Sequence, residues 1–384
     1  MENWDTNRDG ELNTGEAAQV AELGDAFRGN TAVTAFDELQ YFTGLQAIGE
    51  NAFEGCASLR SITIPANVQQ LGQNAFTGTT SLITIEWQGQ MPLTTQALAV
   101  AGIESRSANQ LMYVTGGTPV ELGSDFAAQW IVDGGTEELT LTDGEPLLVT
   151  RPFHAEKATY SRIFSKESGR GDAAGWETLT LPFVVQRIES LTKGELQPFG
   201  AVTGTAHPFW LRQWTGSDFS PATTIMAITP YIISMPNNRM YDEEYNIKGR
   251  VRFMADNVEV LPLDTNGNDY FRPTYLPVAA ASDVYALNDE TYVAQDLQVF
   301  RPGGVFVSNL RGVRPFEAYI HTAGPAGGRE YIPVIIDDTT GLDDLVHTKK
   351  AEDDSDIPIY NLQGQRITRL QRGVNIVRGK KVLK

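Results

Sequence analysis

The sequence has little of the chemistry on which many enzymes and membrane proteins depend. Its only cysteine is Cys56, so it can form neither a disulfide framework nor a thiolate metal cluster. Its four histidines are scattered, without the spacing of metal ligands, at His154, His207, His321 and His347. No apolar run approaches the roughly 20 residues that span a bilayer. The absences therefore argue against a membrane-spanning chain and against cysteine or histidine chemistry.

Positive charge is scarce as well. The 384 residues hold 48 acidic and 30 basic side chains, which gives a formal charge of −18. Such a charge repels phosphate backbones and anionic lipid surfaces, so we expect neither nucleic acid nor a membrane as partner. The nucleophile elbow Gly-x-Ser-x-Gly and the phosphate loop Gly-x-x-x-x-Gly-Lys are missing. A pair of acids for glycoside hydrolysis stays open, because their separation in space cannot be read from sequence.

A repeat is the strongest pattern in the chain. Its two clear copies, offset by 23 residues, read Leu45-x-x-Ile48-Gly49-x-Asn51-Ala52-Phe53-x-Gly55 and Val68-x-x-Leu71-Gly72-x-Asn74-Ala75-Phe76-x-Gly78. The offset lies in the leucine-rich-repeat range and indicates a solenoid of stacked coils. One coil cannot bury its apolar residues alone, so we expect the coils to stack and to leave a ladder of short strands for partners.

The solenoid has different sequences on either side. Residues 1–44 are predicted to form an N-terminal cap, with a helical pattern over 17–23, a strand over 32–36 and a turn over 37–42. After residue 90 the repeat decays, and 111–114 is predicted as a last strand. We therefore place the solenoid at residues 45–130, as two clear repeats and a degenerate end.

From residue 131 the pattern changes to short alternating runs between turn residues, which is typical of an antiparallel sandwich. The clearest strands are expected at 139–142, 179–185, 231–235, 251–254, 305–307, 318–320 and 332–336. The predicted fold class is thus mainly β with a small α component: a short leucine-rich-repeat solenoid followed by a β-sandwich region of one or two units over 131–337. Residues 338–356 are predicted to be an acidic linker and 357–384 a basic β tail.

Residues 5–16 fit the twelve-residue calcium loop of EF-hands. The predicted ligands are the side chains of Asp5, Asn7, Asp9 and Glu16 and the backbone carbonyl of Glu11, with Asn13 direct or through water. Gly10 stands where this loop turns sharply. Too few residues precede the loop for the incoming helix of a full EF-hand, so we predict a structural Ca²⁺ of low affinity. A capping turn that binds no metal is the alternative.

A second motif is aromatic. In a strand over 209–214, Trp210, Arg212 and Trp214 would share one face. Two exposed indoles on one face would form a platform for stacking sugars. The competing interpretation is that both tryptophans are core residues of the sandwich.

The repeat motif, read from Ile48 to Pro65, resembles the BspA-like leucine-rich-repeat proteins, which are secreted or surface proteins of anaerobic gut and oral bacteria. The lead-in at residues 36–45 and the calcium-type loop before it are similar to that family too. The middle region resembles a β domain that often follows such repeats, and the tail resembles C-terminal sorting modules. The resemblance implies export and adhesion to host matrix proteins or to other bacteria. No leader segment is present at Met1, and we expect that one has been removed.

Three functional hypotheses follow. The first is a non-enzymatic secreted or cell-surface adhesion protein that recognises host matrix or bacterial surface proteins through the solenoid and β domain. The second is a carbohydrate-binding protein that captures polysaccharide with Trp210 and Trp214. The third is a hydrolase whose acids lie in the β region. Exposed coplanar tryptophans would favour the second, and two facing carboxylates in a cleft would favour the third.

Overall fold

The computed structural model describes residues 4–89, 91–115, 118, 120–121, 126, 128–169, 174–238, 241, 243–263, 270–322 and 330–335, and the backbone of four C-terminal strands. The chain divides into two compact units, Met1–Ile336 and Asp337–Lys384. The described residues are mostly β with few helices, as predicted. The predicted linker 338–356 lies outside the described residues.

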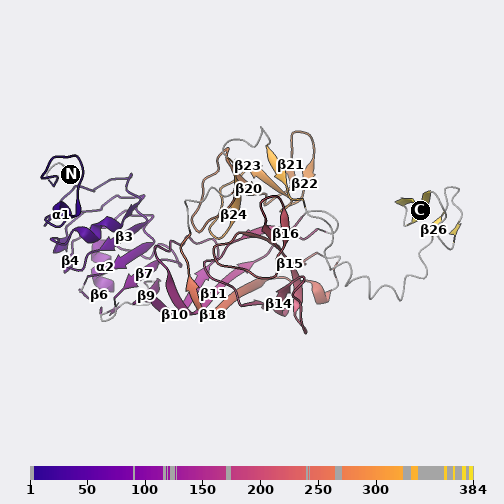
Figure 1. Ribbon diagram of the computed structural model, residues 1–384, viewed down its shortest axis with the longest axis horizontal. Coiled ribbons are helices and arrows are strands. Elements are labelled where there is room, and N and C mark those ends of the chain that lie inside the picture. Colours follow the sequence, from indigo (N-terminus) through magenta and orange to yellow (C-terminus); the bar gives the residue numbers. More distant parts are fainter. Residues whose placement is uncertain are drawn as a thin grey trace. The chain divides into compact units, whose positions relative to one another are not determined.

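The repeats build a ladder of parallel strands (Figure 1). Its order is β1 (Ala35–Phe36), β3 (Ser61–Ile64), β5 (Thr84–Trp87), β7 (Leu111–Val114) and β9 (Gln129–Val132). Shorter parallel pairs join successive coils elsewhere, namely β2 (Ala47–Ile48) with β4 (Gln70–Leu71) and β6 (Leu93–Thr94) with β8 (Val120–Glu121). The register keeps the repeat, since Ile62 pairs with Ile85 and Ile85 with Met112. The ladder therefore extends one strand beyond the last predicted one.

The coils stack through their apolar interior. The rings of Phe27, Phe53 and Phe76 lie in a column, with centroids 5.5 and 5.3 Å apart along it. Cys56 is fully buried beside them and donates from its thiol to the carbonyl of Phe27. Ile62, Ile85 and Met112 point into this same core. The predicted stacking of the repeat residues is thus confirmed. The residues on the opposite side of β3, β5 and β7 form what we call the ladder face.

Helices are few and short among the described residues: α1 (Thr14–Ala17), α2 (Thr95–Ala101) and the 3₁₀ turns η1 (Asp37–Tyr41) and η2 (Glu243–Tyr245). The prediction of a helix over 17–23 is wrong, because a capping box between Asn13 and Glu16 starts the helix upstream and it ends after one turn. Helix α2 was not predicted. It has clear signals, since the Thr94 side chain accepts from the Ala97 N–H and Gly102 ends the helix at φ +75°.

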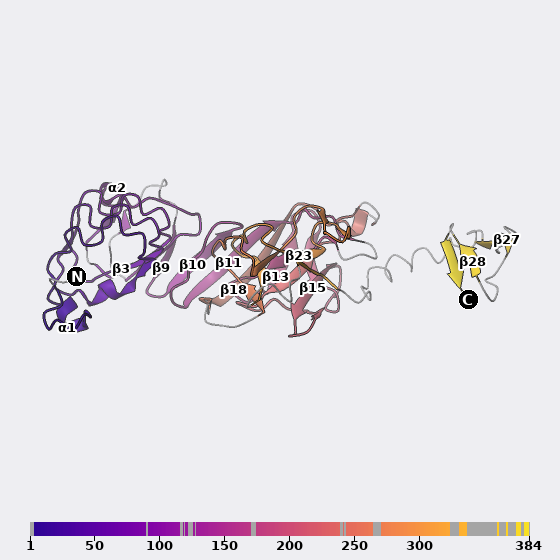
Figure 2. The same ribbon diagram turned by 90° about the horizontal axis from the view of Figure 1, so that it is seen from above.

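The sheet does not stop at the repeats. Strand β9 is followed by antiparallel β10 (Gly135–Thr142), so the ladder runs directly into the strands of the β region (Figure 2). The order continues through β11 (Phe153–Ile163), β18 (Arg250–Val260), β13 (Arg187–Ser190), β14 (Gly194–Pro198), β15 (His207–Trp214), β17 (Tyr231–Ser234) and β12 (Glu177–Leu179), with β16 (Phe219–Pro221) beside β15.

This sheet is mixed, so the prediction of a purely antiparallel arrangement is wrong at two places. Strand β10 runs parallel to β11, and β14 runs parallel to β15. Parallel neighbours cannot be joined by a tight hairpin and need a connection that crosses back over the sheet. Between β10 and β11 that connection is residues 143–152, which we call the crossing segment.

A second sheet lies against the first. It contains β19 (Phe271–Pro273), β24 (Ala318–His321), β20 (Val284–Leu287), β23 (Val305–Ser308) and β25 (Tyr331–Pro333) in that order, with a small hairpin of β21 (Tyr292–Val293) and β22 (Val299–Phe300). Phe219 of the large sheet contacts Phe271 and Phe306 of the smaller one, at centroid distances of 5.2 and 6.2 Å. Aromatic packing therefore joins the two layers.

The C-terminal unit contains a sheet of its own. Its strand order is β27 (Arg366–Ile367), β26 (Ile359–Tyr360), β28 (Val374–Val377) and β29 (Lys380–Leu383). All neighbours in it are antiparallel. These four strands lie in the segment 357–384, for which the sequence predicts a basic β tail.

Candidate functional site

The ladder face of the repeats is partly covered by the chain itself. Thr84 on β5 donates from its hydroxyl to the carbonyl of Leu148 at 2.6 Å. Thr150 donates to the carboxylate of Glu86, also on β5, at 2.8 Å. The hydroxyl of Tyr113 on β7 donates to the carbonyl of Arg151 at 3.2 Å. The crossing segment therefore occupies the part of the ladder face that the sequence predicts as a surface for partners.

The ladder face is apolar at β7 and β9, and these strands pack against the β region. Leu111 and Tyr113 of β7 and Ile131 of β9 belong to the core of the β region rather than to the interior of the repeats. The guanidinium of Arg151 lies over the Tyr113 ring, 4.9 Å from its centroid. A partner that used this part of the ladder would have to displace buried apolar side chains, which is unfavourable.

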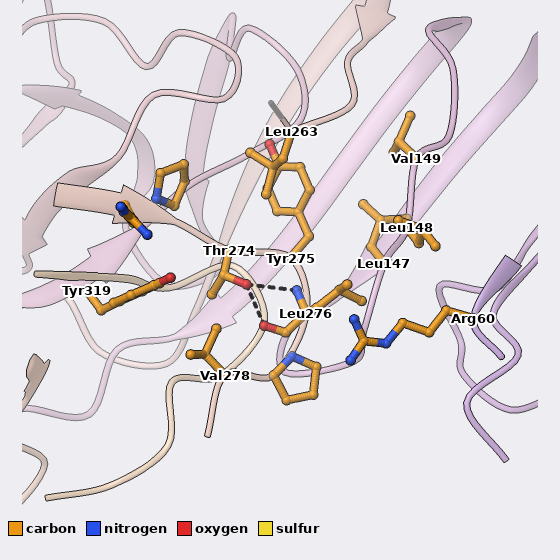
Figure 3. A pocket seen from close by; sticks show the side chains of 13 residues that line it. Arg60, Leu147, Leu148, Val149, Leu263, Thr274, Tyr275, Leu276, Val278 and Tyr319 are labelled. Atoms are coloured by element: carbon orange, nitrogen blue, oxygen red, sulfur yellow. Dashed lines mark hydrogen bonds between the residues drawn. The ribbon is translucent and has the colours of Figure 1, made fainter. Parts of the chain in front are cut away.

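What remains open is a cavity of about 260 Å³ at the margin of this cover, which we call the cleft (Figure 3). Its lining joins one repeat residue to the crossing segment and to residues around β19: Arg60, Leu147, Leu148, Val149, Leu263, Arg272, Pro273, Thr274, Tyr275, Leu276, Pro277, Val278 and Tyr319. Figure 3 shows the Arg60 side chain reaching toward Leu276. The cleft is thus apolar over most of its wall, with arginine at its margin.

Two polar residues of the cleft lining, Arg60 and Tyr275, differ in their exposure. Arg60 is exposed, and no described residue forms an ion pair with its guanidinium. Tyr275 is buried, its hydroxyl has no hydrogen-bond partner among the described residues, and burial raises its pKa far above the ordinary value, so the hydroxyl stays neutral. The cleft can therefore offer the Arg60 guanidinium to a ligand whose body is apolar, beside the polar groups of Arg272, Thr274 and Tyr319 in its lining.

The carboxyl of Asp37, next to Ser61 of the ladder, has a raised pKa. Burial raises the pKa of Asp37, and the carboxylates of Glu86 and Glu38 raise it further. A hydrogen bond from the Ser61 hydroxyl opposes this change. Asp37 therefore holds its proton to a higher pH than an isolated aspartate does.

A second hollow of about 420 Å³, which we call the aromatic hollow, opens where β15 ends. It is lined by Gln213, Trp214, Gly216, Thr229, Pro230, Tyr270 and Phe271. Trp214 is half-buried, and its ring lies 5.2 Å from that of Tyr270. The hollow combines aromatic faces with amide and hydroxyl groups.

The predicted pair of exposed tryptophans is not formed. Trp210 is only 8% exposed and packs on Phe199 and Tyr241, at centroid distances of 5.4 and 6.2 Å. Arg212 is buried and donates to the carbonyl of Phe219 at 3.0 Å. Trp214 lines a hollow, whereas Phe199 and Tyr241 cover Trp210, and Arg212 is held to the carbonyl of Phe219.

The N-terminal loop has the backbone shape of a calcium loop. Gly10 has φ +89°, and its N–H donates to the carboxylate of Asp5 at 2.9 Å. Arg8 and Asp9 also donate from their N–H groups to Asp5. Asn7 and Asp9 are joined by a side-chain hydrogen bond of 2.9 Å. Asp5, Asn7 and Asp9 thus lie together in the loop, as the motif requires.

Glu16, the predicted closing ligand, binds backbone N–H groups of the loop. The Glu16 carboxylate accepts from the N–H groups of Thr6, Asn7 and Asn13. The Asn7 N–H lowers the pKa of Glu16 most; burial opposes it, and the other two N–H groups lower it further. In the described part of the chain, no three side chains of histidine, cysteine, aspartate or glutamate converge as a metal site. The Glu16 carboxylate therefore binds backbone N–H groups of the loop in this structure.

Comparison with known proteins supports the repeat region. Residues 26–98 match the family model described as BspA type leucine rich repeat region (6 copies). No curated protein and no solved structure matches the chain. The segment that matches is therefore of the BspA-like leucine-rich-repeat type. No helix among the described residues is long and apolar enough to cross a membrane.

The sequence did not predict the residues that line the cleft, nor Tyr270 in the aromatic hollow. Arg60 carried a usable signal, because the second repeat has Ile83 at the corresponding place. Tyr275 and Tyr270 carried none, since each enters its hollow only when the smaller sheet packs on the larger one.

Proposed function

We propose that the protein is a non-enzymatic, secreted or cell-surface binding protein: a short solenoid and a β-sandwich region that together hold a protein partner of host or bacterial surfaces in the cleft. The BspA-type repeat region supports this class, because such repeats bind proteins in surface-exposed relatives. The observation that carries the proposal is the position of the cleft: it is open beside the ladder, whereas the crossing segment covers the central part of the ladder face.

The chemistry of the cleft favours an extended protein segment that carries an apolar side chain next to a carboxylate. The apolar wall, with Leu147 and Val149 buried in it, accepts the side chain. Arg60 can bind a carboxylate with two parallel N–H donors. The net charge of −18 repels strongly acidic partners at a distance, so a local carboxylate on a partner of low charge suits the cleft better.

An array of purified host matrix proteins, bacterial surface proteins and polysaccharides tests this proposal at moderate salt and millimolar calcium. We expect saturable binding to at least one protein, weakened roughly 10- to 100-fold by Arg60→Ala, because a charge-assisted pair contributes roughly 1.5–3 kcal/mol. Arg28→Ala is the matched control, since Arg28 is an exposed arginine of the repeats paired with Glu54 outside the cleft. Protein binding that Arg60→Ala leaves unchanged would contradict the proposal.

Calcium in the N-terminal loop is part of the same proposal. Asp5, Asn7 and Asp9 supply side-chain oxygens, Glu11 a backbone carbonyl and Glu16 the closing carboxylate, and the ion stabilises the cap of the repeats. We expect heat in a calorimetric titration and a higher melting temperature at millimolar calcium.

A matched pair of variants identifies the site. Glu16→Gln should abolish both calcium effects, whereas Glu22→Gln should keep them, because Glu22 is an exposed acid outside the loop. No heat and no shift in melting temperature for the wild type would leave the loop as a capping turn without metal.

A further inference from the structure

We infer that the aromatic hollow binds one ring of a neutral carbohydrate. The inference concerns Trp214 and its neighbours, and it does not depend on the cleft, since the two sites share no lining residue. The proposed site differs from the platform of Trp210 and Trp214, because residues of both sheets line it. Strand β15 contributes Gln213 and Trp214, and the start of β19 contributes Phe271 with Tyr270 just before it.

The indole of Trp214 is held in place before any ligand arrives. Phe219 packs against it edge-on, with centroids 5.1 Å apart and planes inclined at 64°. Tyr270 lies beside it at 5.2 Å, inclined at 32°. Phe219 is itself buried and stacks on Phe306 of the smaller sheet. A ring fixed in this way loses little conformational freedom on binding, so stacking on it is favourable.

The lining selects the chemistry of the ligand. A sugar ring has one face of C–H groups, which packs on an aromatic face, and a rim of hydroxyls, which need hydrogen-bond partners. Gln213 offers an exposed amide at the rim, and the Thr229 hydroxyl, which donates to the carbonyl of Ala227, can accept from a sugar hydroxyl. None of the described lining residues is charged, so the lining as described suits a neutral ligand better than an ion. The volume of about 420 Å³ accommodates one ring with its substituents.

The charge of the whole chain points the same way. At −18 the protein repels acidic polysaccharides over long distances, whereas a neutral saccharide is unaffected. We therefore assign the hollow to neutral hexose or N-acetylhexosamine units within a longer chain.

Neutral tetrasaccharides of glucose, galactose, mannose and N-acetylglucosamine test the inference on the full chain. We expect saturable binding of at least one of them, observed by saturation-transfer NMR and by a change in tryptophan fluorescence. Trp214→Ala should weaken it on the order of tenfold, which corresponds to the loss of one stacking contact. Tyr41→Ala removes an aromatic ring that is 46% exposed elsewhere and should leave binding unchanged.

Gln213→Ala keeps the test decisive if Trp214→Ala fails to fold. Gln213 is exposed, so its truncation should leave the melting temperature unchanged while it weakens saccharide binding severalfold. Lack of saturable binding by all four tetrasaccharides overturns the inference, as does binding that neither variant changes. Arg60→Ala should leave saccharide binding intact, so failure here and failure of the protein-binding proposal are separate results.

Discussion

At the scale of single residues, Glu317 holds two arginines at the start of β24. It is 6% exposed, and its carboxylate accepts two hydrogen bonds from Arg311 at 2.8 and 3.2 Å. The Arg314 guanidinium donates two more, at 2.9 and 3.1 Å, and the Arg314 backbone N–H donates a third at 2.9 Å. Burial alone would raise the pKa of Glu317, but Arg311 and then Arg314 outweigh it and lower the pKa to about 2. A carboxyl with a lowered pKa stabilises the fold only while it is ionised.

The contribution of Glu317 to stability should be complete above pH 4.5, its ordinary pKa, and should disappear as the pH falls toward 2. We expect Glu317→Gln to lower the free energy of unfolding by about 3 kcal/mol at pH 7, because it removes the buried anion that two guanidiniums share and leaves them only Asp289. The variant should also lose part of the acid sensitivity of the wild type. Urea unfolding at pH 7, 5 and 3 measures both effects.

Glu189→Gln is the control for that prediction. Glu189 pairs with Arg252 at 3.0 Å, but its side chain is 38% exposed, so the change should cost no more than about 1 kcal/mol. Equal losses for the two variants would mean that burial does not strengthen the Glu317 cluster.

At the scale of the repeat element, one glycine sets how closely two coils approach. A Cβ on Gly72 would lie 2.4 Å from the backbone nitrogen of Glu50 and 2.5 Å from the backbone carbon of Gly49. The Gly72 N–H also donates to the carbonyl of Ile48 at 2.7 Å. Backbone atoms of the preceding coil cannot move aside without disturbing the ladder. Glycine is therefore required at this place in the second coil.

Gly49 holds the same place in the first coil, and nothing lies within 4 Å of a Cβ added there. We expect Gly72→Ala to destabilise the protein by about 1–3 kcal/mol through overpacking. Gly49→Ala should be neutral or stabilising by about 0.4–1 kcal/mol, because it reduces the freedom of the unfolded chain. Thermal unfolding of the two variants compares them directly. A similar loss of stability in both variants would show that glycine is needed for the conformation of its own coil and not for the close approach of two coils.

At the scale of the whole molecule, the repeats and the β region of the first unit share one sheet and one cover. Strand β9 pairs with β10, and the crossing segment bonds to β5 and β7. Residues 1–130 alone would expose Leu111 and Tyr113, which the β region buries. The two parts therefore depend on each other for their stability.

We expect a fragment of residues 1–130 to bind a hydrophobic dye such as ANS and to melt below the full chain, because an uncovered apolar strand face is left in water. Dye fluorescence and circular dichroism measure this, with the full chain as the reference. A fragment that melts sharply at the temperature of the full chain, without binding the dye, would show that the repeats fold independently.

The sequence by itself determined the coil. Phe53 and Phe76 recur at the same place because stacked coils need an apolar interior, and that need acts over a few neighbouring residues, so it is visible as a repeat. The same holds for the backbone of residues 5–16, where Gly10 must adopt a positive φ.

The tertiary structure alone decided which surfaces stay open. The crossing segment covers the ladder because β10 and β11 are parallel, a pairing that no local pattern encodes. Trp210 and Trp214 have the same spacing as residues of one strand face, yet one is buried and the other reaches a hollow. The cleft and the aromatic hollow each combine residues that are distant in the chain, so sheet packing had to bring them together before either site existed.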